Sequence, residues 1–95
     1  MSKIEILLVK AAAKAVADEL PDFENIVSKD YNIFESVDSF SVVNILLESE
    51  LVIETLLGKY VPLANEKIFD AMASPFLKWS NWVDYVIDIV ESKKG

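Results

Sequence analysis

The chain of 95 residues has the length of one domain, and 53% of its residues are hydrophobic, so we expect one packed domain over residues 1–95. Its 16 acidic residues outnumber nine basic ones, all lysine, and the net charge of −7 argues against nucleic acid or an anionic membrane surface as a partner. Cysteine and histidine are absent, which excludes disulfides, thiolate chemistry and a Ser–His–Asp triad within the chain.

The first predicted element is a helix over residues 3–20. Apolar residues recur there at helical spacing, and Pro21 disfavours a helical conformation at Leu20, where the helix is expected to stop. The apolar N-terminal stretch contains Glu5 and lacks a small-residue cleavage site, so it does not read as a signal peptide. We therefore expect a cytoplasmic protein. The positions on the predicted buried face are Ile4, Leu7, Leu8, Ala11, Ala15 and Val16.

A connecting segment over residues 21–38 comes next. It contains enough apolar residues to pack onto the helices, and a short helical turn is expected near residues 24–28.

The second long helix is predicted from Asp38 or Ser39 to Leu57, with Gly58 as its C-terminal stop. Apolar side chains cover most of its circumference, which is typical of a central helix with several neighbours. The acids within it argue against a membrane span. One strip is mostly polar and is the expected exposed face; it comprises Ser41, Asn44, Glu48 and Thr55, with Leu51 as the apolar exception.

The C-terminal third is predicted to hold a short helix over residues 65–73, a turn that begins at Ser74-Pro75, and a last helix that ends near Lys93. Asn65 is the expected cap of the short helix, and Ser80 or Asn81 that of the last one. No strand pattern is convincing. The predicted fold is all-α, a four-helix bundle of three main helices plus a short third helix. The side chains expected to face the core are Ile68, Phe69, Met72, Trp79, Trp82 and Tyr85.

The pair Asp38-Ser39 at the start of the central helix is the sharpest chemical signal. Backbone N–H groups in the first turn of a helix lack partners and the helix dipole is positive there, so a phosphodiester on Ser39 would be stabilised. The competing interpretation is that Asp38 and Ser39 form an ordinary N-terminal cap.

The segment Asp38-Ser39-Phe40 resembles the Asp-Ser-Leu motif of acyl carrier proteins, with Phe in place of Leu, and is similar to the Asp-Ser-Phe form of D-alanyl carriers. Residues 81–86, Asn-Trp-Val-Asp-Tyr-Val, resemble the closing helix of that family, and residues 63–76 look like a subgroup of stand-alone carriers. The order of predicted helices also resembles the family's four-helix bundle over nearly the whole chain.

The resemblance implies a carrier function and no catalysis. Ser39 would carry 4′-phosphopantetheine, transferred from CoA by a phosphopantetheinyl transferase, with Asp38 as motif partner. A ligase or acyltransferase would then load the thiol with an acyl or aminoacyl group as a thioester, for lipid or secondary metabolite biosynthesis. We expect a monomer. The residues expected to dock those enzymes are Phe40, Ser41, Asn44, Glu48 and Glu50.

The motif departs from the family's pattern in two respects. Ser36 stands where the family often has Gly, and the predicted exposed strip of the second helix has lost acids that fatty acid carriers have there. From Glu35 to Leu57 there are still five acids and no lysine, which favours a basic protein partner in a specialised pathway. The alternative is an unmodified helical interaction module in which Ser39 is only a cap and an exposed Leu51 belongs to a permanent interface.

Overall fold

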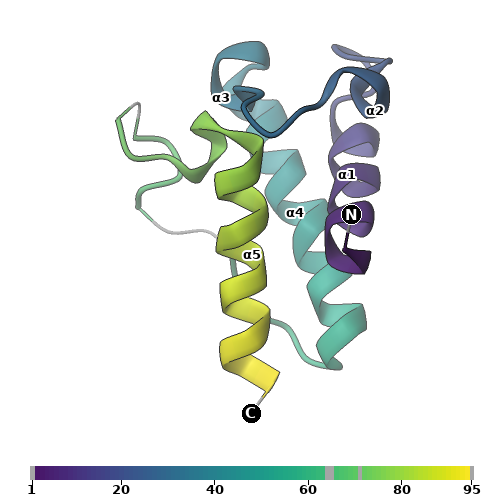
Figure 1. Ribbon diagram of the computed structural model, residues 1–95, viewed down its shortest axis with the longest axis vertical. Helices are drawn as coiled ribbons and strands as arrows, with labels where there is room; N and C mark the ends of the chain where they lie inside the picture. The colour runs from purple at the N-terminus through teal and green to yellow at the C-terminus, as the bar shows by residue number, and fades with distance from the viewer. Residues whose placement is uncertain (1, 64–65, 71, 95) are drawn as a thin grey trace.

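The computed structural model describes residues 2–63, 66–70 and 72–94, and over these residues the protein is helical with no strand. Three long helices lie side by side, and α1 runs opposite to α4 and α5 (Figure 1). The short helices α2 and α3 lie at the end of the bundle where α4 begins (Figure 1). The elements in order are α1 (Lys3–Ala15), α2 (Phe23–Ile26), α3 (Ile33–Ser36), α4 (Ser39–Leu57), the 3₁₀ helix η1 (Pro75–Leu77) and α5 (Trp79–Lys94).

Helix α1 begins as expected but ends at Ala15, so the prediction that it reaches residue 20 is wrong. A turn follows, in which the carbonyl of Val16 accepts hydrogen bonds from the backbone N–H groups of Glu19 and Leu20. The turn places the carboxylate of Glu19 where it accepts a hydrogen bond from the Ser41 hydroxyl of α4. This contact between elements is not visible in a helical repeat.

Helix α4 has the predicted limits because both of its ends are determined locally. At the N-terminus the carboxylate of Asp38 accepts a hydrogen bond from the backbone N–H of Ser41, with 2.9 Å between the heavy atoms. At the C-terminus Gly58 adopts φ = 72°, a left-handed conformation that favours glycine.

The predicted exposed face of α4 is wrong for Ser41, Asn44 and Glu48, because α1 packs against that side, whereas Leu51 and Thr55 are exposed as predicted. Ser41 is only 7% exposed, and Asn44 and Glu48 are half-buried. The exposed face lies further around the helix and is apolar. We call it the outer strip; it consists of Phe40, Val43, Leu47 and Leu51.

The segment between α4 and η1 departs furthest from prediction. Residues 66–69 form turns, so the described part of this segment does not form the expected short helix, and Asn65 lies outside the described residues. Ile68 is buried as predicted, but Phe69 is exposed and Met72 is 88% exposed. The carboxylate of Asp70 accepts a hydrogen bond from the Met72 N–H at 2.8 Å, and this turn interrupts the helical repeat that would direct both side chains inward.

Helix α5 begins at Trp79, ahead of the predicted caps Ser80 and Asn81. Its first two N–H groups have partners in the loop before α3: Trp79 donates to the Tyr31 carbonyl and Ser80 to that of Lys29, each at 2.9 Å. These bonds satisfy amide groups that a helix start leaves without intrahelical acceptors.

Phe76, Trp79 and Trp82 belong to the core, as predicted for the two tryptophans. The rings of Phe76 and Trp82 stack with centroids 4.3 Å apart, and Trp79 packs edge-on against Phe23 at 5.6 Å. Tyr85 is half-buried. Packing in the hydrophobic core therefore explains why aromatic residues occupy these positions.

Candidate functional site

Ser39 is the first residue of α4 and is exposed at the end of the bundle. Its hydroxyl makes no hydrogen bond within the described part of the chain. The capping hydrogen bond comes from Asp38, which precedes it. Since Asp38 caps the helix, Ser39 is not needed for that role.

The backbone around Ser39 suits an attached phosphate. The carbonyl of Asp38 accepts a hydrogen bond from the Val42 N–H at 3.2 Å, which closes the first turn. The N–H groups of Ser39 and Phe40 come before that turn is closed, and a 19-residue helix gives this end a partial positive charge. A phosphodiester oxygen on Ser39 would therefore be close to unsatisfied donors.

One side of the site is acidic. A hollow of about 190 Å³ next to α4 is lined by carboxylates from the α1 end and from the cap, namely Asp18, Glu19 and Asp38. These charges would repel a phosphate from the hollow. A group attached to Ser39 is therefore expected to extend toward solvent.

The residues predicted to dock partner enzymes differ in their exposure to solvent. Phe40 is 75% exposed beside Ser39, whereas Ser41 is buried and bonded to Glu19. Asn44 is half-buried and lines the acidic hollow. Glu48 is half-buried, and its Oε2 lies 3.6 Å from Nζ of Lys14.

Glu50 is 7% exposed and faces the segment after α4. Its carboxylate accepts hydrogen bonds from the Tyr60 hydroxyl at 3.1 Å and from the Leu63 N–H at 2.8 Å. The expectation that Glu50 lies on a docking surface is therefore wrong: this carboxylate is buried because it satisfies a buried backbone donor.

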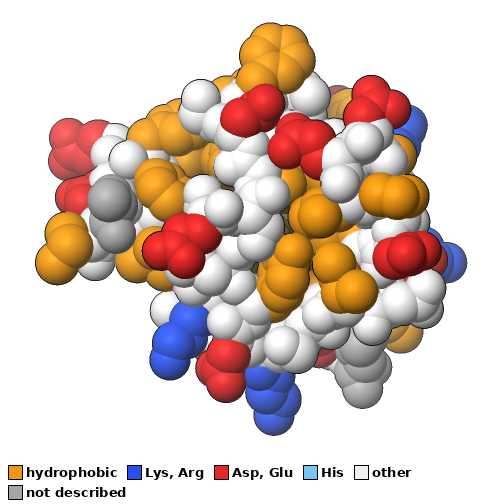
Figure 2. All heavy atoms as spheres, turned by 90° about the horizontal axis from the view of Figure 1, so that it is seen from above, with side chains coloured by type: hydrophobic (Ala, Val, Ile, Leu, Met, Phe, Trp, Pro, Cys, Tyr) orange, Lys and Arg blue, Asp and Glu red, His pale blue; other side chains and the backbone are white. Residues whose placement is uncertain are grey.

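Val43 and Leu47 are candidate docking residues that the sequence analysis missed. The positions 40, 43, 47 and 51 follow helical spacing, so the pattern was present, but only Phe40 was predicted to dock partners and only Leu51 to lie on the exposed face. Seen from the end of the bundle that carries the start of α4, exposed hydrophobic and acidic side chains lie intermingled, and lysines lie near the edges (Figure 2).

The described residues offer no metal site, since no group of three or more potential metal-ligating side chains is found among them. None of the helices in the described part of the chain combines the length and apolar character needed to cross a membrane. The local geometry thus provides an exposed hydroxyl at a helix start, with an apolar strip along the same helix.

Comparison of the chain with protein-family models, with curated proteins and with solved structures gives no match.

Proposed function

We propose that this protein is a carrier of the acyl carrier protein type, which bears 4′-phosphopantetheine on Ser39 and is acted on by other enzymes. The observation that carries the proposal is the division of roles at the start of α4. Asp38 caps the helix, so Ser39 is exposed with a hydroxyl that has no structural role in the described chain. The resemblance of residues 38–40 to the family's motif supports the same conclusion.

The residues at the site fit the prosthetic group. The exposed Ser39 Oγ would attack the β-phosphorus of CoA, lose its proton, and release adenosine 3′,5′-bisphosphate. One oxygen of the Asp38 carboxylate is engaged by Ser41, and the other has no partner in the described chain, so it can orient a metal-bound donor held by the transferase. When attached, the group supplies the thiol that holds the cargo.

We infer that partner enzymes dock on the outer strip rather than on the polar strip. Phe40 lies next to Ser39, and the strip continues through Val43 and Leu47 on the exposed face of the same helix. No lysine occurs from residue 30 to residue 58, while Asp38 and Glu54 are exposed there. A partner with an apolar patch bordered by basic residues would match this surface.

The proposal is tested by incubating the protein with CoA and a broad-specificity phosphopantetheinyl transferase, followed by intact mass spectrometry. We expect one phosphopantetheine addition in the natural chain and in Ser36→Ala, a matched variant of an exposed serine three residues away. Ser39→Ala should remain unmodified. An absence of addition, with a known carrier converted in the same tube, would favour the unmodified interaction module.

A further inference from the structure

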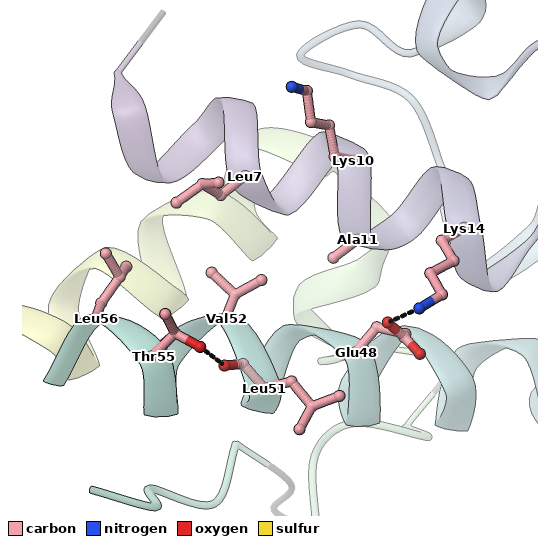
Figure 3. Close-up of a pocket in the computed structure, with 9 residues that line it drawn as sticks. All are labelled: Leu7, Lys10, Ala11, Lys14, Glu48, Leu51, Val52, Thr55 and Leu56. Atoms are coloured by element: carbon pink, nitrogen blue, oxygen red, sulfur yellow. Dashed lines mark hydrogen bonds and ion pairs between the residues drawn. The ribbon is translucent and has the colours of Figure 1, made fainter. Parts of the chain in front are cut away.

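A second surface lies away from Ser39, in the groove between α1 and α4, and Leu51 lines both this groove and the end of the outer strip. The groove encloses about 370 Å³ and is lined mainly by apolar side chains. Leu7 extends from α1 toward α4, and Val52 and Leu56 extend from α4 toward α1 (Figure 3). Ala11 lies between the two helices, and its small side chain leaves the depression open.

The groove has a defined end and a defined length. At one end Lys14 reaches across to Glu48, with 3.6 Å between Nζ and Oε2 (Figure 3). Beyond Leu7, Lys3 and Leu56 line the adjoining hollow. The helical rise from Lys3 to Lys14 corresponds to about 16 Å, or three turns of a partner helix.

The two edges of the groove carry opposite charges. On α1, Lys3, Lys10 and Lys14 follow one another at helical spacing, and neither Lys3 nor Lys10 forms an ion pair within the described part of the chain. Lys10 points away from α4 (Figure 3), so it is available to a molecule lying along that edge. On the α4 edge the exposed charge is Glu54, next to Leu51 and Thr55.

We propose that the α1–α4 groove binds an amphipathic helix of another protein, with an apolar stripe in the groove, acidic residues along α1 and basic residues along α4. A concave seam between two helices matches the convex face of a third. A second copy of this chain fits less well, because two grooves cannot fill each other and each copy carries a net charge of −7. The proposal does not depend on Ser39 carrying a group.

The test uses the full-length Ser39→Ala protein with labelled methyl groups and a designed helical peptide of roughly 15 residues. The peptide has a leucine stripe with glutamates on one edge and lysines on the other, and a second peptide has the two edges exchanged. We expect the correctly patterned peptide to shift the methyl signals of Leu7, Ala11, Val52 and Leu56. The exchanged peptide should bind about tenfold more weakly.

Three variants identify the surface. Lys10→Glu should weaken the correctly patterned peptide about fivefold, since it replaces an attraction with a repulsion. Leu56→Ser should abolish binding, with circular dichroism to show that the fold is retained. Leu47→Ser, an equally apolar position on the outer strip, should leave binding unchanged.

Four results would overturn the proposal. The first is equal binding of the two peptides, and the second is methyl shifts at Val43 and Leu47 of the outer strip in place of the groove. The third is that raising the protein concentration alone produces the groove shifts, which would assign the groove to a second copy. The fourth is that octanoate produces them while neither peptide does, which would assign it to a small amphiphile.

Discussion

The Oε2 atom of Glu50 lies 2.8 Å from the backbone nitrogen of Leu63 and accepts its hydrogen bond. Leu63 is itself buried, and its carbonyl accepts a hydrogen bond from the Tyr85 hydroxyl of α5 at 2.5 Å. The chain after α4 is therefore held between two long helices through one residue. This link holds Leu63 in place at the start of the segment that leads to η1.

Removal of the Glu50 carboxylate should destabilise the protein. Glu50→Ala leaves the buried Leu63 N–H without an acceptor, and we expect a loss of about 2–3 kcal/mol in the free energy of unfolding. Glu50→Gln retains one acceptor and should lose about 1 kcal/mol. Chemical denaturation monitored by tryptophan fluorescence measures both values. Equal losses in the two variants would show that the hydrogen bond to Leu63 contributes nothing.

Tyr60 should ionise at higher pH than an ordinary tyrosine. Its hydrogen bond to Glu50 raises the pKa above the usual 10.0, with smaller contributions from desolvation and from the charges of Glu50 and Glu54. Because the folded-state pKa is raised, the associated stabilisation is complete below pH 10.0 and is lost as the pH rises through the folded-state pKa. Ultraviolet titration checks this, and Glu50→Gln should lower the pKa of Tyr60.

Substitutions of Asp38 and Ser39 should differ in their effects on the free energy of unfolding. Asp38→Ala removes the side-chain acceptor of the Ser41 N–H and should cost about 1 kcal/mol in the free energy of unfolding, whereas Asp38→Asn should cost less. Ser39→Ala should change stability by less than about 0.5 kcal/mol. Thermal and chemical denaturation give both numbers. A large loss in Ser39→Ala would mean that this serine has a structural role.

The outer strip should govern recognition by the transferase without affecting the fold. Leu47→Ser should raise KM for the carrier about tenfold at unchanged kcat, because docking contributes to binding and not to the chemical step. Ile26→Ser is the matched control, since Ile26 is a similarly exposed apolar residue outside the strip. If both variants raise KM equally, the strip has no special role in docking.

The limits of α4 could be predicted from the sequence because they depend on nearby residues, whereas α5 begins where its first amides bond to the distant residues Tyr31 and Lys29. Asp38 and Gly58 determine the limits of α4 through a side-chain cap and a left-handed backbone conformation. The side of α4 that is buried could not be predicted in the same way. Apolar residues cover most of its circumference, so the choice of buried face depends on where α1 packs, which is a property of the whole fold.

The errors around Asp70 and Glu50 have a related cause. Asp70 accepts a hydrogen bond from the Met72 N–H in place of a helical backbone bond, and local competition of this kind is not visible in apolar spacing. Glu50 was expected on the docking surface because it flanks the predicted exposed strip of the helix. Its burial depends on Tyr60 and Leu63, which approach only when the chain folds back.

The central claim, that Ser39 bears the prosthetic group, is tested most directly by fragmentation mass spectrometry of the transferase-treated natural protein. The tryptic peptide that spans residues 30–59 contains Ser36, Ser39, Ser41 and Ser49, so the modified serine can be identified within one fragment series. We predict the whole phosphopantetheine mass on Ser39. Location of that mass on any other serine, or an unmodified peptide after a reaction that converts a known carrier, would contradict the claim.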